Sequence, residues 1–114
     1  MVRIEEKPQP ISAMSIIEMV CKQRRVDMSE CFGSARHQEL VQARNLCFHF
    51  LKYSLSMTLN QIGNIFNKHY STVIYGLVTL SVDLEQNKML RVDFENLKNQ
   101  IQKLTNHENN IKTN

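Results

Sequence analysis

Proline is absent from this chain after residue 10. Both prolines, Pro8 and Pro10, lie close to the N-terminus, and only three glycines occur in the 114 residues. Proline breaks helices because it lacks a backbone N–H and its ring clashes with the preceding turn. A sequence that is free of proline from Ile11 onward therefore predicts an all-α fold.

The length and composition are typical of one globular domain, with 42% apolar and 22% charged residues. We expect residues 1–11 to form an extended arm, residues 12–104 to form the domain and residues 105–114 to form a flexible tail. No apolar run approaches the ~20 residues of a membrane span. The prolines and acidic residues near the N-terminus leave no apolar segment for a secretory signal. We therefore expect a soluble cytoplasmic protein without a membrane partner.

Apolar residues recur at spacings of three and four, which predicts five or six helices. The first helix begins at Ser12, or at Ser15, where Ser15 and Glu18 have the spacing of a capping box. The other expected helices are a short one between Asp27 or Ser29 and Gly33, a long central one over about 38–53, a short one opened by the capping box Thr58–Gln61, one that follows a turn at 67–69, and a last one ending near Leu104.

The last helix carries an apolar seam at Leu90, Phe94, Leu97, Ile101 and Leu104. Such a stripe has to be covered by another apolar surface. We expect it to pack back on the central helix. The alternative is a homodimer formed along the seam.

The excess positive charge lies in the middle of the chain. Between Gly33 and Val82 the bases are Arg36, Arg44, Lys52 and Lys68, and the only acid is Glu39. A surface that faces a polyanion would have this pattern. A buried middle helix would also have it, since buried positions exclude charges of both signs.

The segment from Thr58 to Gly76 has the plan of a DNA-reading helix-turn-helix: a short capped helix, a tight turn and a longer amphipathic helix. Gly63 lies within the short helix, where glycine usually marks the close approach of another backbone. A plain pair of packed helices is the alternative. Side chains that donate or accept hydrogen bonds precede Val73, where a recognition helix reads bases, namely Lys68, His69, Tyr70, Ser71 and Thr72. Ser71 and Thr72 are also candidate helix caps.

This segment resembles the C-terminal DNA-binding domain of the bacterial replication initiator DnaA, whose signature is approximately S-L-x-x-I-G-x-x-F-G-G-R-D-H-T-T-V-x-H-A. The matching residues are Thr58-Leu59, Ile62-Gly63, Phe66, Lys68-His69-Tyr70-Ser71-Thr72-Val73 and Tyr75-Gly76. The turn is one residue shorter than in the signature, and Asn67 stands in place of its glycine pair. The resemblance covers about Ser12 to Leu104.

The resemblance implies a Trp repressor-like fold that binds double-stranded DNA. It places Lys68, His69, Tyr70, Ser71 and Thr72 in the major groove. It places Arg36 and Gln38 near the minor groove, and it assigns phosphate contacts to Arg44, Lys52 and Thr58. The protein would then be associated with the nucleoid.

We expect this function to need no catalysis and no cofactor. The chain lacks the G-x-x-x-x-G-K-[ST] motif, so no nucleotide is expected. Cys21, Cys31, His37 and His49 lack the spacing of a zinc site, so no metal is expected. The alternative to DNA binding is a protein-interaction module that kept the fold and lost its affinity for DNA.

Overall fold

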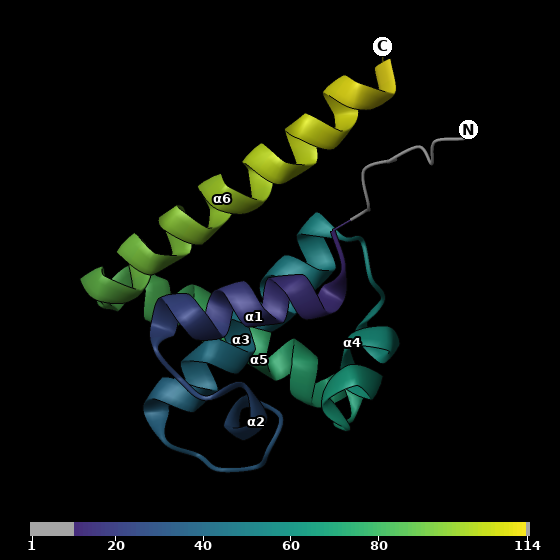
Figure 1. Ribbon diagram of the computed structural model, residues 1–114. Helices are drawn as coiled ribbons and strands as arrows, with labels where there is room; N and C mark the ends of the chain where they lie inside the picture. Colours follow the sequence, from purple (N-terminus) through teal and green to yellow (C-terminus); the bar gives the residue numbers. More distant parts are fainter. Residues whose placement is uncertain (1–10, 114) are drawn as a thin grey trace.

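The computed structural model describes residues 11–113, and their side chains up to residue 105 (Figure 1). This part of the chain folds into the helices α1 (Ala13–Arg24), α2 (Met28–Cys31), α3 (Gln38–Ser54), α4 (Leu59–Phe66), α5 (Tyr70–Gln86) and α6 (Lys88–Thr113). It contains no strand, which confirms the predicted all-α class. The expected arm lies outside the described residues except for Ile11, which packs against the core.

Helix α3 is the centre of the fold and contacts every other helix. Most of its residues are buried, among them Leu46, Phe48 and Leu51. Burial therefore explains the lack of acidic residues after Glu39 on α3. It does not explain the same lack from Tyr70 through Val82 on α5, where many side chains are exposed.

Local hydrogen bonds fix where the helices begin. The Ser12 hydroxyl accepts from the backbone N–H of Ser15 and caps α1, so the capping box predicted at Ser15 is wrong and the earlier start is correct. The predicted capping box of α4 is confirmed. There the Thr58 hydroxyl accepts from the Gln61 N–H, while the Gln61 side chain accepts from the Thr58 N–H.

Helix α6 buries its seam within the monomer. Leu90, Leu97 and Ile101 are fully buried and Phe94 is partly buried, whereas Leu104 is 45% exposed. The seam packs on α1 and α5 as well as on the central helix α3. The described structure thus covers most of the surface that the homodimer alternative would have used.

Helix α6 is longer than expected. It continues to Thr113, so residues 105–113, which we expected to form a tail, extend the helix instead. Figure 1 shows its C-terminal end projecting past the other helices. Among the described helices, none combines the length and the apolar character that a bilayer crossing requires.

A polar network joins the three helices α1, α3 and α6. The Arg24 guanidinium donates to Asp93 of α6 at 2.6 Å and to the Gln42 side chain of α3 at 2.6 Å. The Gln23 amide donates to the other Asp93 oxygen at 2.9 Å. These bonds fix the first and last described helices of the domain against the central one.

Two glycines allow helices to approach closely. A Cβ added at Gly63 would collide with the backbone carbonyl oxygen of Lys68, and one added at Gly76 would lie 2.5 Å from the Asn45 side chain and 2.8 Å from the Phe48 ring. The expectation that Gly63 marks a close backbone contact is therefore correct. Both contacts position the same helix, α5.

His49 lies half-buried on α3 in an aromatic setting. Its ring is within 5 Å of the rings of Phe50, Tyr53 and Phe94, measured between centroids. Burial lowers the pKa of His49 from its usual value, and the nearby charge of Lys98 lowers it further. The neutral imidazole is therefore the form that the folded protein favours.

We predict that Gly63→Ala destabilises the domain by about 2 kcal/mol or more, because the new methyl group meets backbone that cannot rotate away. The exposed neighbour Asn64 provides the control, since Asn64→Ala makes a similar gain in helix propensity without the collision. Urea denaturation measures both. Equal stabilisation of the two variants would contradict the close contact.

We also predict an acid-sensitive component of stability. Because the pKa of His49 is lowered on folding, the unfolded chain binds the proton more readily, and stability present above about pH 6.5 is lost as the pH falls below it. Thermal unfolding of His49→Gln should show a weaker fall in Tm over this range. His37→Gln, in an exposed loop, should keep the wild-type profile. If His49→Gln also keeps the wild-type pH profile, the His49 imidazole is not the cause of the loss of stability in acid.

Candidate nucleic-acid interface

The turn between α4 and α5 is short and sharply defined. Helix α4 ends at Phe66 and is capped by Asn67, whose φ of 55° lies in the left-handed region that asparagine tolerates. The Lys68 N–H then donates to the Gly63 carbonyl at 2.8 Å. The Phe66 ring anchors the end of α4 by packing edge-on against Phe48.

His69 is the N-cap of α5. Its Nδ1 accepts from the Ser71 backbone N–H at 3.1 Å, and its ring stacks on Tyr70. The structure therefore gives the capping role to His69, and the candidate caps Ser71 and Thr72 were wrong. Both residues instead lie exposed in the first turn of α5, where the Ser71 hydroxyl is 2.8 Å from His69 Nδ1.

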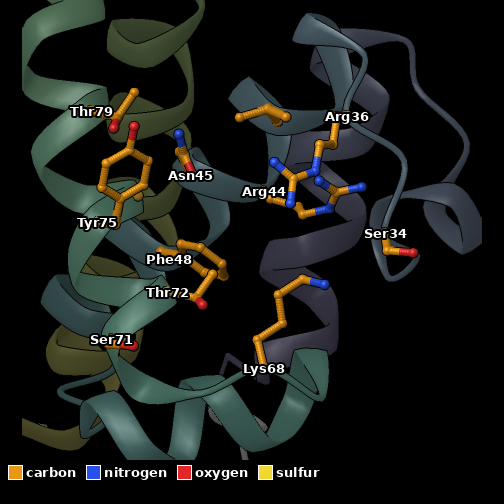
Figure 2. Close-up of a pocket in the computed structure, with 12 residues that line it drawn as sticks. Ser34, Arg36, Arg44, Asn45, Phe48, Lys68, Ser71, Thr72, Tyr75 and Thr79 are labelled. Atoms are coloured by element: carbon orange, nitrogen blue, oxygen red, sulfur yellow. The ribbon is translucent and has the colours of Figure 1, made fainter.

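A groove of about 720 Å³ separates the beginning of α5 from the loop that precedes α3 (Figure 2). It is lined by Ser34, Arg36, Val41, Arg44, Asn45, Phe48, Lys68, Ser71, Thr72, Tyr75, Gly76 and Thr79. Figure 2 shows the α5 side chains on one wall and the two arginines on the other, with Lys68 at one end. None of the described residues that line the groove is acidic.

Arg44 holds the loop in place. It is only 6% exposed, and its Nε donates to the Cys31 carbonyl at 2.7 Å while its Nη2 donates to the Ala35 carbonyl at 2.7 Å. Its guanidinium thus fixes the backbone on either side of Gly33. Only a phosphate contact was predicted for Arg44 from the sequence, and these bonds to the loop were not.

Lys68 joins the helix-turn-helix to the same loop. Its ammonium group donates to the Gly33 carbonyl at 3.4 Å, across 35 residues of sequence. The loop is therefore held from both sides, by α3 and by the turn before α5. This arrangement brings the exposed Arg36 side chain next to the groove.

The groove brings together five of the residues predicted from the sequence, namely Arg36, Arg44, Lys68, Ser71 and Thr72. The other five predicted residues lie outside it. Gln38 is exposed at the first turn of α3, Lys52 is half-buried beside the Tyr53 ring, Thr58 caps α4, and His69 and Tyr70 form the stacked pair that begins α5.

Three residues that line the groove, Asn45, Tyr75 and Thr79, were not predicted from the sequence as site residues. Tyr75 follows Ser71 by four residues and Thr79 follows Tyr75 by four, so helical spacing from Ser71 contained a signal for both. Asn45 follows Arg44 directly on a largely buried helix. Nothing in its local sequence marks it as lining a groove.

The three cysteines lie buried near α2. A hydrogen bond to Cys31, together with burial, raises the pKa of the Cys21 thiol far above its usual range. The protonated thiol is a poor metal ligand and a poor nucleophile. Among the described residues, no cluster of three or more histidine, cysteine or acidic side chains is arranged to hold a metal ion.

The chain is similar to proteins named "Chromosomal replication initiator protein DnaA". It is 32% identical to the one from Bacteroides fragilis over 103 residues, which is 90% of this chain and 21% of that protein. It is 32% identical to the one from Mycoplasma genitalium over 76 residues, covering 67% of this chain and 17% of that protein. The chain thus spans about a fifth of the length of these curated relatives.

The family described as "Bacterial dnaA protein helix-turn-helix" matches residues 13–79, from the start of α1 to the groove-lining part of α5. The match includes both walls of the groove, all of α4 and the turn, and α5 as far as Thr79. It confirms the resemblance inferred from the sequence, and with it the prediction that the chain is not an enzyme, because this domain binds DNA. The chain belongs to the bacterial DnaA helix-turn-helix family of DNA-binding domains.

Proposed function

We propose that this chain binds double-stranded DNA in a sequence-specific manner, with the beginning of α5 in the major groove. The observation that carries the proposal is the groove itself. It brings the cations Arg36 and Lys68 to the exposed hydroxyl groups of Ser71 and Thr72, although these residues come from separate segments. Cations position a protein on the phosphate backbone, and side chains of the first helical turn reach base edges.

The loop over residues 33–37 supports a second contact with the duplex. It is exposed, it carries Arg36, and Arg44 and Lys68 hold it beside α5. An arginine presented on a fixed loop suits insertion into the narrow minor groove. Gln38, exposed at the start of α3, lies two residues after Arg36 and would also approach the minor groove of the DNA.

Phosphate contacts complete the proposed footprint. The N-terminus of α5 directs the positive end of its helix dipole toward the solvent beside the exposed residues Ser71 and Thr72, which favours a phosphate there. Lys52 lies near the end of α3 and Thr58 caps the start of α4. Both lie outside the protein groove and would hold other phosphates of the DNA. His69 and Tyr70 would contact bases or phosphates next to Lys68.

We propose a role in replication initiation or in its regulation. The support is the name shared by the relatives, "Chromosomal replication initiator protein DnaA", of which this chain matches about a fifth. Binding to chromosomal DNA would place the protein with the nucleoid in the cytoplasm.

The first test is the salt dependence of DNA binding. If the exposed bases neutralise about 3 to 5 phosphates, log K falls against log salt concentration with a slope of about −3 to −5. Mobility shift or fluorescence anisotropy with random duplexes measures the slope. Arg36→Ala should reduce it by about 1.

Lys103 offers the matched control, since it is an exposed cation on α6 that does not line the groove. The last turns of α6 and the 33–37 loop lie on opposite sides of the molecule in Figure 1. Lys103→Ala should therefore leave the slope unchanged. A wild-type slope near zero would instead favour the protein-interaction alternative.

The second test separates base reading from electrostatic attraction. Thr72→Ala should cost about 1 to 3 kcal/mol on a sequence selected by the protein and leave both the salt slope and the affinity for scrambled DNA intact. Ser81→Ala is the control, because that hydroxyl lies on the same helix and donates to the Val78 carbonyl. If Thr72→Ala binds selected and scrambled duplexes as the wild type does, Thr72 reads no base.

A further inference from the structure

The outward face of α5 is apolar. Tyr75 is 73% exposed, Val78 is 59% exposed and Val82 is 47% exposed. Tyr75, Val78 and Val82 are spaced by three and four residues, so they form one ridge along the helix, which we call the α5 ridge. Ser71, four residues before Tyr75, lies on the same face. Within the described monomer the ridge lies opposite the buried residues Val73 and Leu80.

The side chains that read most bases are missing from this part of the helix. From Tyr70 through Val82 the sequence contains no Arg, Lys, Asn, Gln, Asp or Glu. Arg and Lys read guanine, Asn and Gln read adenine, and Asp and Glu accept from cytosine. Only hydroxyl groups and apolar surface remain available to this face. The base edge that offers an apolar group in the major groove is thymine, through its C5 methyl group.

We propose that Tyr75 and Val78 select thymine by packing against its C5 methyl groups. This inference rests on the DNA-binding function proposed above and names the bases that the same interface prefers. Burying a methyl group against an apolar side chain is favourable and needs no hydrogen bond. The DNA site of this protein should therefore carry thymines opposite the second and third turns of α5.

The position of the ridge favours DNA as its occupant. Tyr75 belongs both to the ridge and to the groove wall, beside Thr72 and Thr79 (Figure 2). A helix rises about 1.5 Å per residue, so the distance along the helix from Ser71 to Val78 is about 10 Å, the length of about three base pairs. Tyr75 and Val78 thus continue the surface on which Ser71 and Thr72 lie.

Charge marks where the DNA-facing part of α5 ends. The first acidic residues of the helix are Asp83, directly after Val82, and the exposed Glu85. A polyanion is repelled by these carboxylates. Val82 therefore shares the face and the exposure of Val78 but lies beyond the part that approaches DNA. It serves as the matched control.

The experiment compares two duplexes that differ only in methyl groups. A site selected by the wild-type protein is synthesised with thymine, and again with uracil at every thymine position. The C5 position faces the major groove, so the phosphates and the minor-groove edges are unchanged. We expect the uracil duplex to bind at least about fourfold more weakly, which corresponds to about 0.8 kcal/mol per methyl group.

Three variants assign the effect to residues. The double variant Tyr75→Ala/Val78→Ala should bring the thymine-to-uracil affinity ratio close to one, and Val78→Thr, which keeps the shape of the side chain, should lower it in part. Val82→Ala should keep the wild-type ratio. Circular dichroism checks that each variant is folded, and all three changes lie at exposed positions.

The outcomes separate the possibilities. Equal wild-type affinity for the two duplexes, or an unchanged ratio in the double variant, overturns thymine selection while DNA binding stands. Failure to bind any duplex overturns the proposed function as well. Sedimentation showing a wild-type dimer that the double variant lacks would make the α5 ridge an interface between copies, which also overturns the proposal.

Discussion

The contact between the backbones of Gly63 and Lys68 determines the geometry on which the rest of the interface depends. The Lys68 N–H donates to the Gly63 carbonyl, and the Lys68 carbonyl fills the space that any side chain at position 63 would occupy. This contact fixes where α4 ends and therefore how α5 leaves the turn. The cap at His69 and the direction of the Lys68 side chain follow from it. A single glycine thus connects local chain geometry to the placement of the residues proposed to read DNA.

The basic loop depends on the same contact indirectly. Lys68 reaches back to the Gly33 carbonyl from one side, while Arg44 holds the Cys31 and Ala35 carbonyls from the other. Two cations thereby hold the backbone of this loop, a kind of segment that is generally more mobile than the helices it connects. Arg36 gains a defined position beside α5 without making any of these bonds itself. The interface is therefore preorganised, which lowers the entropy cost of binding.

Much of the fold could be predicted from the sequence because its signals are local. Apolar spacing located the helices, and the Thr58–Gln61 capping box is complete within four residues. Prediction failed where two local signals competed, as for Ser12 and Ser15, or where an uncommon residue took the role, as His69 did. The role of Arg44 in holding the loop could not be predicted either. Its partners are backbone carbonyls, which every residue carries, so no residue type in the sequence marks them. What α6 covers depended on tertiary packing, which a periodic seam does not specify.

The network of Arg24, Gln42 and Asp93 has a consequence for how the domain assembles. Arg24 and Asp93 are 69 positions apart in the sequence, so their ion pair closes most of the domain into one loop. Contacts of such long range form late, since much chain entropy is lost before they can form. The helix-turn-helix and its α3 support are local by comparison and can fold first. In a hydrogen-exchange experiment, α6 is then expected to open at a lower free energy than the helix-turn-helix and α3.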